Sequence, residues 1–509
     1  MTAERSTIPE VLTRRRHRGE HPLLICDGER ISYAEADQRS ARLARGLIAL
    51  GAGKGTHVGL LYPNGVDFVV AMLAATRIGA VVVPFSTFST PPELRWQLAH
   101  SAVGILLSCN HYRAHDYPLL LAAALGIASF ESPVLATAAP QLRHIVFDIG
   151  QLAEACNPAL TEVESDVDSD DTLAIIYTSG STGTPKGAVH THRGLLDHQR
   201  SLNDIRGLTA QDTLFSNSPF FWIGGFAFGL LATLTAGCTL VCSNAVEAAA
   251  TLDLLEAEKP TMTNGFVASV NHLTRDPSFA GRDLSSMRRG NLYPIMAPDV
   301  RPADPELRHN ILGMTEAGSV LLISGDDNDQ PEHRRGSYGR PAPGFEAMII
   351  DTDRSGVGEL CIRGPYVMQR YHGRSREDCF DADGWFHTGD LVRTDSDGLF
   401  YFLGRAGSMI KTAGANVSPA EVERALTRIT GCTAFVVGLA DSERGQIVAA
   451  AVATEDPAGF DEPGVVAALR ADLSAYKIPR RFVPVLPHEV PLLSSGKVDL
   501  PELARLFDA

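Results

Sequence analysis

The sequence lacks the features that would assign it to a secreted or nucleic-acid-binding class. Its eight cysteines are scattered over 509 residues and form no CxxC pair, which disfavours a zinc or dithiol motif. Asp and Glu outnumber Lys and Arg by 60 to 45, and the net charge is -15, whereas binders of polyanions need the opposite balance. We therefore expect reduced thiols, a cytoplasmic location and no nucleic-acid partner.

Long apolar runs are also scarce, and a single stretch suggests a membrane span. Residues 219–243 contain no Asp, Glu, Lys or Arg, but glycines at four positions interrupt their apolar surface. Glycines of this kind are typical of a helix that packs closely in a soluble core. The basic run Arg14-Arg15-Arg16 is not followed by an apolar segment, so a secretory signal is not expected. The sequence predicts no transmembrane segment.

Alternating helical and strand-like patterns predict an α/β fold. A capping box at Ser32 starts a helix that should end at Gly51. Two apolar runs, 57–62 and 80–85, enclose a helical pattern and form a βαβ unit. Similar runs recur at 173–177, 239–242 and 434–438. We expect layered, mostly parallel β-sheets covered by helices.

The chain is too long for one ordinary core, so we expect two domains. Residues 398–415 are rich in turn-forming residues, and a second capping box, Ser418-Pro419-Ala420-Glu421, follows. We expect a domain boundary near residues 403–407. We predict a large N-terminal domain over residues 1–403 and a small α+β domain over residues 404–509.

The most informative segment runs from Tyr177 to Gly187, with the sequence YTSGSTGTPKG. Glycines let backbone N–H groups approach phosphate oxygens, hydroxyls add donors, and Lys186 offsets phosphate charge. It is not a Walker A loop, because Pro185 precedes the lysine and Gly187 follows it. The segment predicts a polyphosphate-binding loop of another kind.

This loop resembles the signature of the ANL superfamily of adenylate-forming enzymes, which includes acyl-CoA synthetases, adenylation domains of peptide synthetases and luciferases. The resemblance covers nearly the whole chain, because further motifs follow in the family's order. They are Gly313-Met314-Thr315-Glu316, residues 336–344, residues 384–390, Gly404-Arg405 with Ile410-Lys411 and Gly414, and residues 491–497.

The resemblance implies specific roles for these residues. Lys497, Lys186, Thr178 and Glu316 would carry the catalysis, and Glu316 and Thr178 would hold Mg²⁺ through the ATP phosphates. Asp390 would accept both ribose hydroxyls. The nucleotide-binding set is Thr178, Ser179, Gly180, Ser181, Thr182, Gly183, Lys186, Leu312, Gly313, Met314, Thr315, Glu316, Asp390, Arg405 and Lys497. The C-terminal domain would be a mobile lid that carries Lys497.

The resemblance also locates an acyl pocket, whose aromatic content favours an apolar, cyclic or aromatic acid. Its predicted residues are Phe220, Phe221, Trp222, Gly224, Phe226, Phe266 and Val267. The sequence departs from the family at four places. Trp222 replaces a histidine that gates the thiol tunnel, Leu312 replaces the aromatic residue on adenine, Gly407 replaces a charged pivot, and residues 288–295 lack the Gly-Gly-Ala-Pro turn.

Two histidines near the loop, His190 and His192, lack further ligands at zinc spacing, so we expect structural or solvent-facing roles for them.

Together these features predict an ATP- and Mg²⁺-dependent acid:CoA ligase. It would form an acyl-AMP from a small-molecule carboxylic acid and pass the acyl group to coenzyme A. The sequence leaves monomer and homodimer open.

Three alternatives remain open. The activated group could pass to a carrier protein or an amine, or the oxyanion could be nitrite rather than a carboxylate. A non-catalytic binding protein with the same fold is a second alternative, and a luciferase-type oxygenation is a third.

Overall fold

The chain divides into two compact units. Unit 1 spans residues up to 87, 98–178 and 187–404, and unit 2 contains residues from 405 onward with the segment 88–97 and residues 185 and 186. The computed structural model describes residues 6–152, 160–178, 185–352, 356–405, 410–491 and 498–508.

The first helices of unit 1 begin at side-chain caps. Helix α1 (Ile8–Arg15) is capped by Thr7, and α2 (Tyr33–Ala49) by Ser32, whose hydroxyl accepts the Glu35 backbone N–H at 3.1 Å. The chain turns at Gly51 with a φ of +87°. The predicted helix is confirmed, since its N-cap and its end near Gly51 both come from local chemistry.

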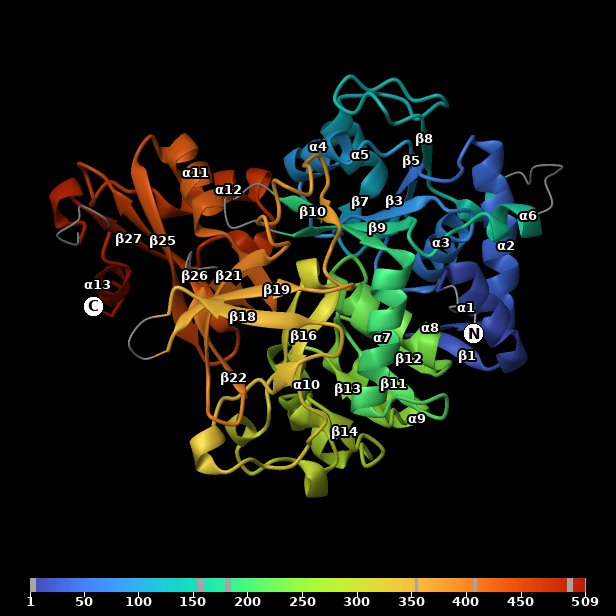
Figure 1. Cartoon of the computed structure of the whole chain (residues 1–509). Coiled ribbons are helices and arrows are strands. Elements are labelled where there is room, and N and C mark those ends of the chain that lie inside the picture. The colour runs from blue at the N-terminus through green and yellow to red at the C-terminus, as the bar shows by residue number, and fades with distance from the viewer. Residues whose placement is uncertain are drawn as a thin grey trace. The chain divides into compact units, whose positions relative to one another are not determined.

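A seven-stranded sheet forms one layer of unit 1. Its order is β20-β10-β9-β4-β3-β5-β8, and β3, β4, β5, β8 and β9 pair in parallel. Helix α3 (Val66–Thr76) connects β3 to β4, which confirms the predicted βαβ unit, and it lies beside α2 (Figure 1). The strands are β3 (His57–Leu61), β4 (Val81–Pro84), β5 (Ile105–Ser108), β8 (His144–Val146), β9 (Thr172–Thr178), β10 (Lys186–Thr191) and β20 (Arg370–Tyr371).

A six-stranded sheet forms another layer. Its order is β14-β13-β11-β12-β1-β2, and its pairs are parallel except β1 with β2. The strands are β1 (Pro22–Cys26), β2 (Glu29–Ser32), β11 (Thr213–Ser216), β12 (Thr239–Cys242), β13 (Met262–Asn264) and β14 (Arg289–Gly290). The remaining α-helices that begin before residue 280 are α4 (Pro91–His100), α5 (Tyr117–Leu125), α6 (Leu160–Ser165), α7 (His192–Arg206), α8 (Ala232–Ala236), α9 (Ala248–Glu258) and α10 (Asn271–Thr274).

The uncharged stretch 219–243 is buried in unit 1. It forms a π-helix over Gly224–Leu231, then α8 and β12. A side chain at position 225 would collide with the Pro219 carbonyl oxygen, so glycine is required there. Within the described part of the chain, no helix is long and apolar enough to cross a membrane.

The later part of unit 1 is antiparallel, which the sequence patterns had not indicated. One sheet has the order β15-β16-β17 and another the order β18-β19-β21-β22. The strands are β15 (Leu312–Met314), β16 (Ser319–Ile323), β17 (Arg340–Pro341), β18 (Glu346–Ile350), β19 (Gly358–Arg363), β21 (Phe386–Thr394) and β22 (Phe400–Arg405).

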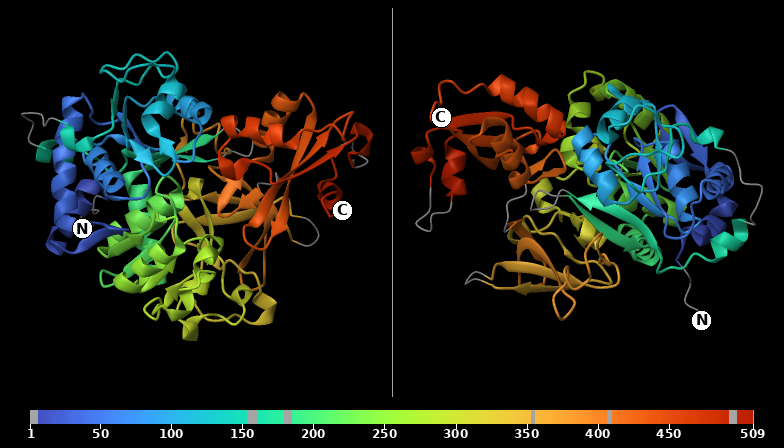
Figure 2. Two further views of the ribbon diagram at one scale, coloured as in Figure 1. Left: turned by 180° about the vertical axis from the view of Figure 1, so that it is seen from behind. Right: turned by 90° about the horizontal axis from the view of Figure 1, so that it is seen from above.

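Unit 2 is an α+β layer structure. Its sheet has the order β24-β23-β26-β25, with β27 beside β26, and its two faces pack separate cores. In Figures 1 and 2 its residues from 410 onward run from orange to red toward the C-terminus. Its elements are β23 (Ile410–Thr412), β24 (Ala415–Val417), β25 (Thr433–Asp441), β26 (Gly445–Ala453), β27 (Arg481–Val485), α11 (Pro419–Thr430), α12 (Glu462–Asp472) and α13 (Leu500–Arg505).

Two local predictions in unit 2 need correction. The run 434–438, grouped with the parallel strands, lies in β25 and pairs antiparallel with β26. Helix α11 begins after Ser418 as predicted, but the capping box does not form, and the Ser418 hydroxyl is buried without a partner among the described residues. Glu421 instead accepts a hydrogen bond from Lys477 Nζ at 2.9 Å, because a buried ammonium attracts the carboxylate more strongly than a backbone N–H does.

The α/β fold class is confirmed. The domain limits 1–403 and 404–509 stay a prediction about separately folding domains.

Candidate functional site

The ends of two neighbouring strands flank the predicted phosphate loop. Thr178 is the last residue of β9 and Lys186 is the first of β10, and both are half-buried. These strands are neighbours in the seven-stranded sheet. Five predicted phosphate ligands lie outside the described residues, and their contacts stay predictions: Ser179, Gly180, Ser181, Thr182 and Gly183.

The carboxylate of Glu316 is held in place beside this sheet. Glu316 is 9% exposed, and Tyr371 donates its hydroxyl to the Glu316 Oε1 atom at 2.7 Å. Tyr371 belongs to β20 and pairs with Ala188 of β10. The second carboxylate oxygen has no hydrogen-bond partner among the residues that the structure describes. A fixed carboxylate with an open oxygen fits the needs of a hard cation.

A second contact fixes the same turn. His190 on β10 lies with its Nε2 atom 2.8 Å from the Thr315 carbonyl oxygen. Burial lowers the pKa of His190 to about 4, so the ring is neutral and donates its Nε2–H to that oxygen. His192, also buried, accepts the Ile8 backbone N–H at its Nδ1 atom. The two histidines therefore hold backbone segments in place, His190 the turn that carries Glu316 and His192 the start of α1.

The other residues of this motif differ in exposure. Leu312 and Met314 are 4% and 7% exposed and belong to the core, while Gly313 between them is exposed. Leu312 pairs with Leu322 across β15 and β16. The side chain that replaces the expected aromatic residue is therefore packed in the core.

Two further motifs meet around Asp390. This residue lies in β21, is 3% exposed, and donates its backbone N–H to the Thr388 hydroxyl at 3.0 Å. Burial and the neighbouring Asp390 charge raise the pKa of Tyr338, which places these two predicted segments together. Arg405 ends β22, whereas Gly407 and Lys497 lie outside the described residues.

The predicted acyl-pocket residues separate into three environments. Phe220 and Phe226 are at most 1% exposed and pack against Phe68 at 5.3 and 6.4 Å between ring centroids. Phe221 is buried and meets the half-buried Trp222 edge-on at 5.6 Å. Gly224 begins the π-helix, and helices of this type often occur at functional sites. Phe266 and Val267 are 46% and 38% exposed.

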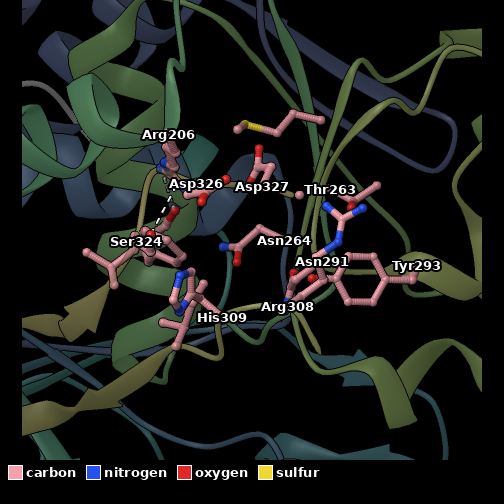
Figure 3. A pocket seen from close by; sticks show the side chains of 15 residues that line it. Arg206, Thr263, Asn264, Asn291, Tyr293, Arg308, His309, Ser324, Asp326 and Asp327 are labelled. Carbon is pink, nitrogen blue, oxygen red and sulfur yellow. Dashed lines mark hydrogen bonds between the residues drawn. The ribbon is translucent and has the colours of Figure 1, made fainter. Parts of the chain in front are cut away.

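A cavity of about 60 Å³ lies next to these segments (Figure 3). It is enclosed by the end of α7, the π-helix, β13, β14, the chain before β15 and the end of β16. Residues 288–295, which include Tyr293, were noted as a departure from the family's sequence, whereas Arg206, which also lines the cavity, was not predicted. A basic residue in the last turn of a helix looks like an ordinary response to the helix dipole, so the sequence held no signal for Arg206.

Known proteins similar to this chain are adenylate-forming enzymes. The family model described as AMP-binding enzyme matches residues 12–372. The chain is 31% identical to a feruloyl-CoA synthase of an Amycolatopsis species, over 94% of each chain. It is 32% identical to a methyl-dioxo-octahydro-indenyl propanoyl:CoA ligase of Mycobacterium tuberculosis, over 98% of this chain and 99% of that one.

The fold also has solved counterparts. A double mutant of o-succinylbenzoate CoA synthetase from Bacillus subtilis superimposes with a TM-score of 0.76 at 24% identity, over 99% of this chain and 98% of that one. The family match covers most of the chain and includes the loop strands, Glu316 and Tyr371. The chain therefore belongs to the AMP-binding enzyme family, and it is an adenylate-forming ligase of the acyl-CoA synthetase kind.

Proposed function

We propose that the protein is an ATP- and Mg²⁺-dependent ligase that converts a medium-sized cyclic or aromatic carboxylic acid into its CoA thioester. The observation that carries this proposal is the fixed carboxylate of Glu316, held by Tyr371 beside the strands that flank the phosphate loop. The names of the two relatives, which specify a feruloyl and a bicyclic propanoyl group, support a ring-bearing acid.

The proposed reaction has two steps. A carboxylate oxygen attacks the α-phosphorus of ATP, the bond to pyrophosphate breaks, and an acyl-AMP forms. The thiolate of CoA then attacks the acyl carbon, and AMP leaves with the bonding electrons. Lys186, Thr178 and Lys497 would stabilise the charge on the phosphate oxygens in the first step.

Magnesium fits the residues that would hold it. The open oxygen of Glu316 would face the cation, and the Thr178 hydroxyl lies at the end of β9. When bound, Mg²⁺ would neutralise charge on the pyrophosphate leaving group. The role of Tyr371 and His190 is to keep the Glu316 turn in one geometry.

A different acceptor is the second candidate, because Trp222 carries a large half-buried indole where relatives carry the gating histidine. The activated acyl group would then pass to an amine or a carrier protein. Cytoplasmic location and the choice between monomer and homodimer remain predictions.

The test is an assay of pyrophosphate release with a panel of carboxylic acids, followed by mass detection of the product with CoA present. We expect release that depends on ATP and an acid, and a thioester when CoA is added. Lys497→Ala should slow adenylation by more than roughly tenfold, while thioester formation from supplied acyl-AMP changes less, because only the first step needs that cation. Equal losses in both steps would contradict the role of Lys497, and a wild type that releases no pyrophosphate with any acid would contradict the function.

A further inference from the structure

The cavity next to the predicted acyl segments holds a guanidinium group that the protein uses only in part. Arg206 ends α7 and stacks on the Phe228 ring, with Cζ 4.0 Å from the ring centroid. Its Nη2 atom donates to Asn203 Oδ1 at 2.9 Å and to the Phe228 carbonyl at 3.2 Å. The Nε atom is buried and has no partner among the described residues. The guanidinium is thus held rigidly while donors remain unused.

Arg206 also has no ion-pair partner in the described part of the chain, whereas Arg308 in the same cavity pairs with Asp329 at 2.5 Å and the nearby Arg289 pairs with Asp212. Burial lowers the pKa of Arg206 to about 10, so the group stays charged near neutral pH. Arg206 is half-buried, and a cation that is partly removed from water without an ion-pair partner is destabilised, so an acceptor oxygen from a ligand would be favourable there.

A second polar side chain faces the same space without a partner. Asn264 is 7% exposed, and its amide has no hydrogen bond among the residues described. Figure 3 shows this amide in the middle of the cavity, between the side of Arg206 and the side of Tyr293 and Arg308. Buried amides in folded proteins are normally paired. The cavity therefore offers at least two unfilled polar positions.

The size and place of the cavity limit what can enter. About 60 Å³ is room for a few water molecules or one small polar substituent, but not for a long alkyl chain. Ile311 in its wall comes two residues before Gly313 of the nucleotide motif, and Phe228 follows the predicted acyl segment by two residues. The cavity thus adjoins the region where the acyl group would lie.

We propose that this cavity receives the far end of the acid substrate, and that Arg206 with Asn264 selects acids bearing a second oxygen acceptor there, either a neutral carbonyl or a carboxylate. This inference rests on the proposed ligase function and narrows its substrate class. Asp326 and Asp327, which also line the cavity, are exposed, so water weakens their repulsion of an anion. They nonetheless favour the neutral carbonyl over the carboxylate.

The experiment compares acids that differ only at the far end. The acids are phenylacetates and phenylpropanoates that carry a para-acetyl, para-carboxyl or para-isopropyl group. Within each series the three acids have nearly the same shape, and the two spacer lengths place the para group at two distances from the reacting carboxylate. We expect the wild type to prefer the acetyl or carboxyl acid over the isopropyl acid by about tenfold or more in kcat/KM, because a hydrogen bond to a charged group is worth about 10- to 100-fold. The acetyl and carboxyl arms distinguish a neutral acceptor from an anion.

Two substitutions test whether Arg206 is the cause. Arg206→Met keeps the packing on Phe228 and removes the donors, so the preference should disappear through a higher KM for the oxygenated acid, with kcat changed less than about threefold. Arg206→Lys keeps the charge but loses the planar fork, and an intermediate preference is expected. Arg308→Met is the matched control, because that cavity residue is already paired and its loss should affect both kinds of acid alike. Melting curves of each variant report on folding.

The outcomes separate the two proposals. If the wild type activates these acids but Arg206→Met and wild type show the same ratio at both spacer lengths, the selection by Arg206 is wrong and the ligase function stands. If no acid releases pyrophosphate, the ligase function fails, and calorimetric titration of the para-acetyl and para-isopropyl phenylpropanoates then decides the inference alone. Binding of the acetyl acid that is lost in Arg206→Met would support it, and equal or absent binding by the wild type would overturn it.

Discussion

Each unit holds a cation inside its fold, a buried lysine in unit 2 and a half-buried arginine in unit 1, and the two cations have opposite surroundings. In unit 2, Lys477 is 5% exposed, and its Nζ atom lies 2.7 Å from Glu93 and 2.9 Å from Glu421. In unit 1, Arg206 has stacking and two hydrogen bonds but no carboxylate within ion-pair distance in the described part of the chain. The comparison suggests that a fully paired buried cation belongs to the architecture, whereas a partly paired one at a cavity is kept for a ligand.

The pKa shifts of the two groups support this comparison, because they have opposite directions. Burial alone would lower the pKa of Lys477, but Tyr476 and the two carboxylates raise it above its ordinary value. The pKa of Arg206 is lowered by burial, with no carboxylate to reverse the change. The surroundings of Lys477 therefore favour its charged form, whereas those of Arg206 disfavour its charged form.

The largest effect should come from breaking the paired cluster. Lys477→Met leaves two nearly buried carboxylates facing each other, and we expect unit 2 to lose about 3–5 kcal/mol of unfolding free energy. Urea unfolding of the full chain followed by circular dichroism measures this loss. Adding Glu93→Gln and Glu421→Gln should restore much of it, and the exposed Lys259→Met is the control. A loss below about 1 kcal/mol in Lys477→Met would remove the basis of the comparison.

An effect that is smaller for each group involved should follow from acid. Burial lowers the pKa of His190, His192 and His372 to about 4 and that of His198 to about 3, and all four lie in unit 1. A lowered folded-state pKa means that the unfolded chain binds the proton first, so this stability is present above about pH 6.5 and is lost as the pH falls toward 4.

The measurement is the urea midpoint at pH 7 and at pH 5. We expect each of these four histidines to contribute about 2 kcal/mol to the loss in unit 1 over this interval, since pH 5 lies about 1.5 units below the unfolded-state pKa and each unit is worth about 1.4 kcal/mol per group. His198→Phe keeps a ring against Tyr366, where the two rings stack at 5.1 Å, and should reduce the pH dependence. Unit 2 contains one histidine, His488, from residue 405 onward, so equal acid sensitivity of both units would contradict this explanation.

The smallest expected change in stability, that of Arg206→Met, tests the comparison of the two cations most directly. Arg206→Met removes two hydrogen bonds but also removes a charge that has no ion-pair partner among the described residues, so the unfolding free energy should change by no more than about 1 kcal/mol. The same urea experiment as for Lys477→Met gives the value. A loss of 3 kcal/mol or more, as large as that expected from Lys477→Met, would assign Arg206 to the architecture instead of to ligand recognition.

The structural elements that could be predicted from sequence are those specified by residues adjacent in the chain. The helix from Ser32, the βαβ unit around α3 and strand β9 before the loop follow from caps, periodicity and turn residues that act over a few positions. The capping box at Ser418 shows where local prediction fails. It does not form, because Glu421 accepts a hydrogen bond from a lysine 56 positions away instead. The prediction of parallel pairing for the run 434–438 was wrong for the same reason, since the sequence of the run does not reveal which strand it pairs with or in which direction.

By itself the sequence predicted a polyphosphate-binding loop and indicated the family, because both signals lie in short contiguous segments, residues 177–187 and 313–316. The tertiary structure alone decided how those segments are supported and what else enters the site. Tyr371 reaches Glu316 through the pairing of β20 with β10, and Arg206 meets Asn264 across a cavity built from separate elements. Contacts of this kind depend on strand register and helix packing, which are set by burial over the whole unit rather than by neighbouring residues.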